Sequence, residues 1–223
     1  MDYFNARERA KQHAFGAKRE QLFAGIIALL IRVKATPNQV SVLGVCFLGL
    51  ACVLPSQWHW GVAICLVLYV LCDGLDGPLA RTLGTAGPGG SLVDMVADQM
   101  GVVLLPAAAI HHIQAWGPAM VVFSSAYLCF IALVVYANSQ GIKLRPFVRV
   151  KYVFFGLYWL SLALQRDLVT CFAALCGAYY VLEGAVALKR MYGFHESRRV
   201  SGAAKGEEAR EEAEQEPEPT NTE

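Results

Sequence analysis

Hydrophobic residues along this chain gather in long runs between residues 37 and 192, and polar residues gather at both ends. A helix needs about 20 mostly apolar residues to cross a bilayer, and several runs approach that length. Turn-forming and polar positions separate the runs. The pattern predicts six membrane-spanning helices, at about residues 37–56, 60–82, 90–111, 117–139, 149–165 and 168–190. The expected fold is therefore an all-α, polytopic integral membrane protein.

The segment before the first predicted span has a different pattern. Residues 2–20 mix basic and aromatic positions, which is typical of an amphipathic helix lying on a membrane surface. The apolar run Leu22–Ile31 is too short to span. Thr36 and Pro37 then predict a helix start, with Thr36 as N-cap and Pro37 at the first helical position. We expect an interfacial helical segment at residues 1–35 and a transmembrane domain at residues 36–192.

The chain ends in a polar stretch. From Gly202 onward the sequence is rich in Ala, Glu and Pro and has no large apolar side chain. Such a composition cannot bury enough apolar surface to offset the entropy of ordering the chain. We expect residues 193–223 to form a disordered acidic tail.

Composition fits this membrane assignment, with 56% hydrophobic residues and a net charge of +1. The placement of the positive charges predicts the orientation of the helices in the membrane. With the predicted spans, 18 of the 19 Lys and Arg residues fall on one side, and Arg166 is the exception. Positive residues gather on the cytoplasmic side of membrane proteins. Both termini and the loop after the second span are therefore expected to be cytoplasmic.

Four aspartates lie near the cytoplasmic ends of the second and third predicted spans. Asp73 and Asp76 are three residues apart, and Asp94 and Asp98 are four apart, so each pair shares one helix face. Consecutive antiparallel helices bring these ends together. Clustered carboxylates repel one another unless cations neutralise them, and oxygen ligands suit divalent metals. The pattern indicates a metal site that binds a phosphorylated ligand.

The residues between the two aspartate pairs add to this site. Arg81 is the cation within the motif, and its planar guanidinium suits a diphosphate. Pro78 is expected to break or kink the second helix just after Asp76. The linker at residues 85–90 is short, turn-prone and glycine-rich, so its backbone can approach a phosphate closely.

The motif as a whole reads Asp-x2-Asp-Gly-x2-Ala-Arg-x8-Gly-x3-Asp-x3-Asp, and it resembles the signature of the CDP-alcohol phosphotransferases (CDP-alcohol phosphatidyltransferases). The opening Thr36-Pro-Asn-Gln-Val-Ser41 of the first span and the six-helix layout are also similar to this family, so the resemblance covers about residues 20–192. All eight fixed positions of the signature are met, by Asp73, Asp76, Gly77, Ala80, Arg81, Gly90, Asp94 and Asp98.

This resemblance implies an enzyme of phospholipid biosynthesis. Such an enzyme transfers a phosphatidyl or other substituted phosphate group from a CDP-linked lipid to the hydroxyl of a small polar alcohol and releases CMP. Asp73, Asp76 and Asp94, with Asp98 nearby, would hold Mg²⁺ or Mn²⁺, with two ions expected. By family analogy Asp98 is the general base, although metal ligation by Asp98 is an open alternative. We also expect a homodimer. The resemblance further implies a CDP-binding set of Asn38, Gly77, Ala80, Arg81, Thr85 and Gly90.

A second cationic group lies on the same side, around the last two predicted spans. Such a group suits a phosphorylated acceptor alcohol, but ordinary positive-inside topology explains it equally simply. The candidate acceptor-binding residues are Lys143, Arg145, Arg149, Lys151 and Arg190.

Other functions compete with this interpretation. Within the family, the alternative is a CDP-choline or CDP-ethanolamine type of transfer to a lipid alcohol. A cation transporter using the aspartates as a relay is a different class, but it leaves Gly77, Arg81 and Gly90 without a role. An aspartate-rich prenyltransferase would need a second acidic motif, which the sequence lacks.

Overall fold

The computed structural model describes residues 23–142, 144, 147, 148 and 150–215, and this part of the chain is all-α, as predicted. A short 3₁₀ turn, η1 (Ser56–Trp58), precedes α3. A helix lies at each of the six predicted positions: α2 (Pro37–Val53), α3 (His59–Thr82), α4 (Pro88–Ile113), α5 (Gly117–Ser139), α6 (Lys151–Leu164) and α7 (Val169–Gln215).

The entry into α2 follows the predicted capping chemistry. Thr36 Oγ1 accepts a hydrogen bond of 3.3 Å from the backbone N–H of Gln39. Gln39 Oε1 in turn accepts one of 2.9 Å from the backbone N–H of Thr36, which completes a capping box. Pro37 occupies the first helical position, where its missing N–H costs nothing.

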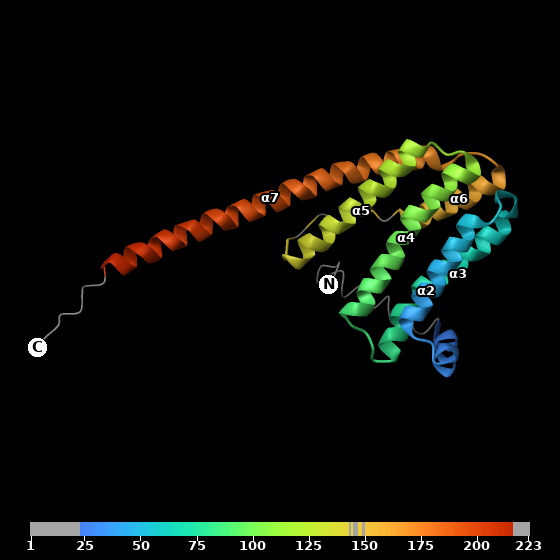
Figure 1. Ribbon diagram of the computed structural model, residues 1–223, viewed down its shortest axis with the longest axis horizontal. Helices are drawn as coiled ribbons and strands as arrows, with labels where there is room; N and C mark the ends of the chain where they lie inside the picture. Colours follow the sequence, from blue (N-terminus) through green and yellow to red (C-terminus); the bar gives the residue numbers. More distant parts are fainter. Residues whose placement is uncertain (1–22, 143, 145–146, 149, 216–223) are drawn as a thin grey trace, which may run out of the picture.

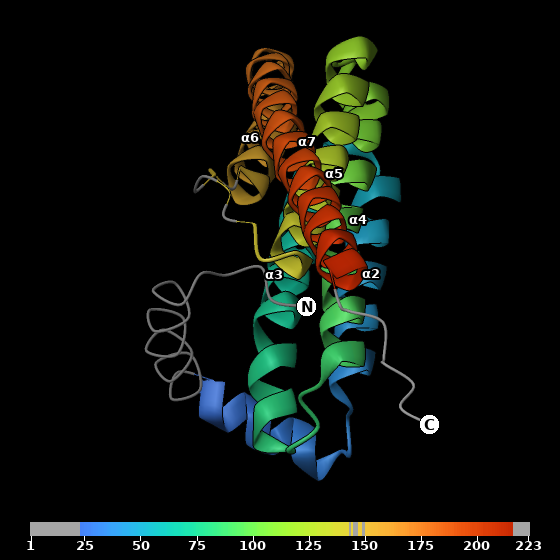
Figure 2. The ribbon, with the colours of Figure 1, turned by 90° about the vertical axis from the view of Figure 1, so that its left-hand side faces the viewer.

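A short apolar helix, Phe23–Arg32, precedes α2 and meets it at an angle of 109°. Its Ile27 is buried with Val40 of α2 and Leu79 of α3, so the short helix packs against the end of the bundle that carries the aspartate motif. Figures 1 and 2 place it beside the α3–α4 loop. The surface helix predicted over residues 2–20 lies outside the described residues.

Consecutive helices run in opposite directions, so α2 packs antiparallel to α3 and parallel to α4, and α5 packs parallel to α7 (Figure 1). Aromatic side chains fill the space between α5, α6 and α7. The ring of Phe123 stacks on that of Phe154 at a centroid distance of 5.3 Å, and Tyr127 meets Tyr180 edge to face at 4.9 Å. This core fixes α6 against α7, and with it the position of Lys151 at the start of α6.

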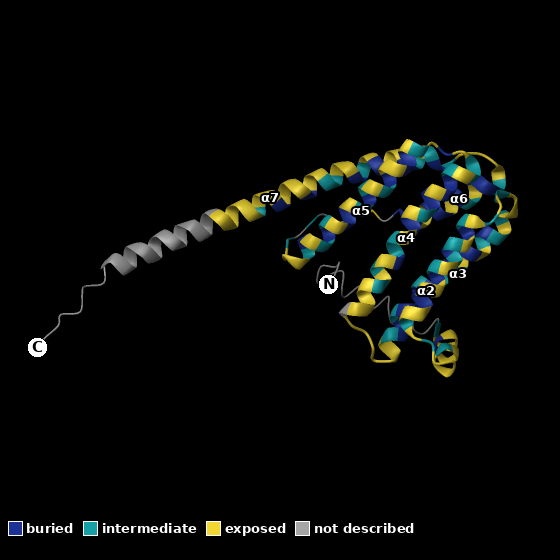
Figure 3. Cartoon of the chain, viewed as in Figure 1, coloured by how far each residue is buried: buried dark blue, intermediate teal, exposed yellow. Residues whose placement is uncertain are grey.

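Four described helical segments are long and apolar enough to cross a membrane, or five if the bent pair Phe23–Arg32 and α2 counts as one span. Many large apolar side chains of the bundle are exposed, as expected for side chains that face lipid. Figure 3 shows how exposed and buried positions are distributed along the helices. The chain is therefore a multi-pass membrane protein. Helix α6 has 14 residues, which is roughly 21 Å and shorter than the hydrocarbon core.

Two local features differ from the predictions. Helix α3 continues through Pro78 to Thr82, so of the expected break or kink the break does not occur. A single proline removes one backbone hydrogen bond, and here Pro78 and Leu79 are buried in the packing that holds this turn. Helix α7 also continues beyond residue 192 to Gln215, where disorder was expected (Figure 1). Ala, Glu, Lys and Arg are strong helix formers, which accounts for an extension of the last span. Residues 216–223 lie outside the described residues.

Candidate functional site

The aspartate motif lies on the facing ends of α3 and α4, which a five-residue turn connects (Figure 2). Helix α3 ends in a glycine cap. Gly84 has a φ of +65°, and the N–H of Thr85 donates to the carbonyl of Ala80 at 2.9 Å. Only glycine adopts this backbone conformation without strain. The cap turns the chain sharply, so Asp73 on α3 and Asp98 on α4 come to the same side of the hairpin.

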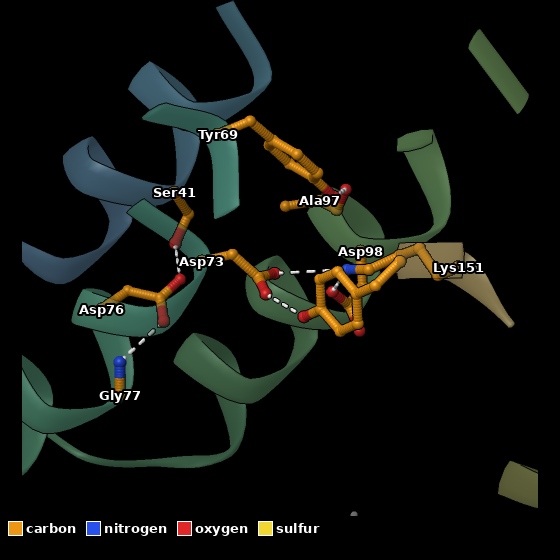
Figure 4. A network of polar contacts seen from close by, with 9 residues as sticks. Ser41, Tyr69, Asp73, Asp76, Gly77, Ala97, Asp98 and Lys151 are labelled. Carbon is orange, nitrogen blue, oxygen red and sulfur yellow. Dashed lines mark hydrogen bonds and ion pairs between the residues drawn. The ribbon is translucent and has the colours of Figure 1, made fainter. Parts of the chain in front are cut away.

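Asp73 and Asp98 meet at the side chain of Lys151, the first residue of α6 (Figure 4). The Lys151 ammonium donates a hydrogen bond to Asp98 Oδ1 and forms an ion pair with Asp73 Oδ1 at 3.6 Å. The side chains of Lys151 and Asp73 are 5% and 10% exposed, whereas that of Asp98 is 41% exposed. The three charges therefore form a buried cluster that opens to solvent at Asp98.

Two tyrosines enclose this cluster. The Tyr152 hydroxyl donates to Asp73 Oδ2 at 2.9 Å, so Lys151 and Tyr152 occupy different oxygens of the same carboxylate. The Lys151 ammonium also lies 4.8 Å from the Tyr152 ring centroid and 5.4 Å from that of Tyr69. The Tyr69 hydroxyl donates to the carbonyl of Ala97 at 3.1 Å, which ties α3 to α4 beside Asp98.

Asp76 lies one turn further along α3 and faces α2 instead (Figure 4). Its Oδ2 accepts a hydrogen bond of 2.6 Å from Ser41, and its Oδ1 accepts one of 2.7 Å from the backbone N–H of Gly77. Asp76 is buried at 6% exposure. An ionised carboxylate at such a site needs hydrogen-bond donors, and Ser41 and Gly77 supply them.

Most of the remaining motif residues are exposed, and we call this exposed part of the α3–α4 hairpin its open side. Asp94 and Arg81 are exposed, as are Asn38 in the first turn of α2 and Thr85 in the turn. Ala80 is partly buried. A side chain at Gly90 would meet nothing within 4 Å, and a Cβ at Gly77 would lie 3.5 Å from Arg81 Nη1. Gly77 thus leaves space beside the Arg81 guanidinium, and Gly90 borders open space.

The predicted acceptor residues have separate positions. Lys143, Arg145 and Arg149 lie outside the described residues. Arg190 on α7 is exposed and, with Leu144 and Glu183, lines a small hollow between α5 and α7. Lys151 was assigned to the acceptor from sequence, but its ammonium contacts the aspartates.

The donor set has the chemistry that Mg²⁺ or Mn²⁺ requires, because all four candidate ligands are carboxylates. Asp73 and Asp98 already share one cation, the Lys151 ammonium, so this pair fits a positive ion. Over the part of the chain that the structure describes, no three acidic, His or Cys side chains gather as a ready metal cage. Asp76 is turned toward Ser41. Ligation by all of the predicted residues therefore requires side-chain rotation.

Sequence reasoning did not find Ser41, Tyr69 or Tyr152 as parts of the site. Ser41 is the last residue of the Thr36–Ser41 stretch at the start of the first span, and Tyr152 directly follows a lysine at a helix start. The sequence therefore provided a weak indication that each belongs to the site. Tyr69 lies one turn before Asp73 in an apolar run and carried none.

The chain is similar in sequence to known proteins. A family model described as CDP-alcohol phosphatidyltransferase matches residues 34–187. The chain is 28% identical over 191 residues to a phosphatidylinositol phosphate synthase of Cutibacterium acnes, covering 72% of this chain and 89% of that protein. It is 30% identical over 94 residues to a phosphatidylcholine synthase of Brucella melitensis, covering 40% of this chain and 32% of that protein. No solved structure matches.

Proposed function

This chain belongs to the CDP-alcohol phosphatidyltransferase family and is a membrane transferase of phospholipid synthesis, and we propose that it moves a phosphatidyl group from CDP-diacylglycerol to a small polar alcohol. The observation that carries this proposal is the placement of the complete aspartate motif on the facing ends of α3 and α4. The site is buried toward α2 and open at Asp98 and Arg81, as a reaction between a lipid and a water-soluble alcohol requires.

The donor is proposed to bind at the open side of the hairpin. Arg81 contacts its phosphates, and Gly77, Ala80 and Gly90 leave room for the nucleotide, with Asn38 and Thr85 at the rim. Asp73, Asp76, Asp94 and Asp98 are the residues that would hold Mg²⁺ or Mn²⁺, with two ions expected. Bound metal would neutralise the diphosphate and improve CMP as a leaving group. Ser41 and Tyr152 orient Asp76 and Asp73 for this task.

The acceptor hydroxyl is proposed to approach from the solvent side at Asp98. Asp98 is the most exposed of the three charged residues in the Lys151 cluster, so it is the one that a soluble alcohol reaches. As general base, its carboxylate takes the proton from the hydroxyl while the oxygen attacks phosphorus in line. Metal ligation is the alternative role for Asp98, and the Asp98→Asn variant distinguishes the two roles.

The proposed acceptor is a phosphorylated alcohol. The cations Lys143, Arg145, Arg149, Lys151 and Arg190 suit a phosphate, and the relative from Cutibacterium acnes is a phosphatidylinositol phosphate synthase. An unphosphorylated alcohol is the competing acceptor class, because the same cations satisfy positive-inside topology without binding substrate. Transfer to a lipid alcohol is the other alternative within the family.

We further propose that six segments, α2 to α7, cross the membrane, with both termini and the aspartate motif on the cytoplasmic face. The charge distribution supports this topology. A homodimer is proposed as the assembly.

The test is release of CMP by the purified full-length protein in mixed micelles. CDP-diacylglycerol is incubated with Mg²⁺ and a panel of alcohols, including glycerol phosphate, inositol phosphate, inositol and choline. We expect CMP release to depend on the alcohol and to be fastest with a phosphorylated alcohol. If no alcohol supports release, the phosphatidyl-transfer proposal is wrong, and cation flux in proteoliposomes then tests the transporter alternative.

A further inference from the structure

The Lys151 ammonium occupies a cation site built from two carboxylates and two aromatic rings. It bonds to Asp98 Oδ1, lies 3.6 Å from Asp73 Oδ1, and faces the rings of Tyr69 and Tyr152. Its side chain is 5% exposed. A buried charge is tolerated only when it is paired and its donors are satisfied. The hydrogen bond to Asp98 and the ion pair with Asp73 supply the pairing, so the lysine and the two aspartates stabilise one another.

We propose that Lys151 is a resident counter-cation, which holds Asp73 and Asp98 together while no metal is bound and must leave them before a divalent ion binds. This inference rests on the proposed function, which assigns both aspartates to the metal. A divalent ion ligated through Oδ1 of Asp73 and Oδ1 of Asp98 would take the oxygens that the ammonium now contacts, and two cations at that distance repel each other. Lysine and metal therefore compete for one site.

We expect the Lys151 side chain, rather than the backbone, to move in this exchange. Lys151 is the first residue of α6, and its ammonium ends a flexible four-carbon stem. Asp73 keeps a partner when the ammonium leaves, because Tyr152 donates to the other oxygen, Oδ2. The carboxylate therefore stays oriented for its new ligand. The displaced ammonium is then available to the phosphate of an acceptor beside Asp98, so metal loading would prepare the acceptor site.

Metal affinity measured without substrate tests this competition. Mn²⁺ binding to the purified full-length protein is followed by electron paramagnetic resonance. Lys151→Gln is expected to bind Mn²⁺ about tenfold more tightly, because a competing positive charge is gone. Lys151→Arg keeps the charge and is expected to stay near the wild type. Lys189→Gln, an exposed lysine of α7, is the control for loss of a charge and is expected to change nothing.

Thermal stability gives a second readout of the same inference. In EDTA, Lys151→Gln is expected to have a lower Tm than the wild type, because Asp73 and Asp98 lose their counter-ion. Mn²⁺ is expected to restore the Tm. If Lys151→Gln fails to fold, the same measurements are made on Lys151→Met, whose side chain has a similar length and no charge.

Unchanged or weaker Mn²⁺ affinity in the neutral variants would overturn the inference. The proposed function fails by a different observation, the absence of CMP release from the wild type with every alcohol tested. A wild type that releases CMP, combined with neutral variants of unchanged Mn²⁺ affinity, removes the counter-cation and leaves the transferase proposal intact.

Discussion

The Ser41 hydroxyl donates a 2.6 Å hydrogen bond to Oδ2 of Asp76 and thereby ties α2 to the aspartate motif on α3. Both residues are buried, at 5% and 6% exposure. The other oxygen of Asp76 is held by the backbone N–H of Gly77. Helix α2, which contributes no acidic residue to the motif, therefore sets the direction of this carboxylate together with Gly77 of α3.

Ser41→Ala is expected to lower the free energy of unfolding by about 1.5–3 kcal/mol, the usual contribution of a hydrogen bond to a charged group. The half-saturating Mg²⁺ concentration for CMP release should rise, because Asp76 loses the contact that orients it. Thermal melts in detergent and Mg²⁺ titrations measure the two effects. Ser139→Ala, an exposed serine at the end of α5, is the control. Wild-type values in both assays would show that Ser41 does not position Asp76.

Removal of divalent metal is expected to abolish CMP release. The clustered carboxylates and a substrate diphosphate repel one another without cations to neutralise them. EDTA should reduce the rate to background, and Mg²⁺ or Mn²⁺ should restore it, as measured by CMP release from CDP-diacylglycerol. Full activity in EDTA would contradict the assignment of Asp73, Asp76 and Asp94 to a metal.

Asp76→Asn and Asp98→Asn are expected to differ in which step they affect. Asp76→Asn should weaken binding of a CDP analogue, because a proposed metal ligand is lost. Asp98→Asn should preserve most of this binding and stop the chemical step, because an amide cannot accept the proton. Isothermal titration calorimetry and single-turnover kinetics separate binding from chemistry. Equal loss of binding in both variants would reassign Asp98 to metal ligation.

Gly101→Ala is expected to destabilise the bundle near the site. A Cβ at this position would lie 2.8 Å from the Phe155 ring and 3.2 Å from the Tyr69 hydroxyl. Overpacking of this kind costs about 1–3 kcal/mol. Gly49→Ala in α2 is the matched control, because its Cβ meets nothing within 4 Å and should keep or raise the Tm. Equal Tm values for the two variants would contradict the tight packing of α4 against α3 and α6 at Gly101.

Neutralising the candidate acceptor cations tests the class of alcohol. Single Lys143→Gln, Arg145→Gln and Arg149→Gln changes should raise the KM for a phosphorylated alcohol and leave the KM for CDP-diacylglycerol unchanged. A charge-assisted contact is worth about 1.5–3 kcal/mol, so an essential residue should shift the KM about tenfold or more. Unchanged kinetics in all three would favour an unphosphorylated acceptor.

The sequence by itself determined where the helices lie and where the motif falls on them. Apolar run lengths and caps act over a few residues, so the positions of α2 to α6 and the Thr36 cap followed from local pattern. The spacing of Asp73, Asp76, Asp94 and Asp98 placed them correctly on the facing ends of consecutive helices. Local pattern left a break or a kink open at Pro78, and α3 continues unbroken through this position.

Only the tertiary structure decided which side chains complete the site. The motif residues lie within one hairpin, but Ser41 is 35 residues from Asp76, and Lys151 and Tyr152 are 53 and 79 residues from Asp98 and Asp73. These contacts depend on how α2 and α6 pack against α3 and α4. Packing of this kind is set by the shape of the whole core and leaves no periodic signal in the sequence. For that reason the contacts of Lys151 with Asp73 and Asp98 could not be predicted from the sequence.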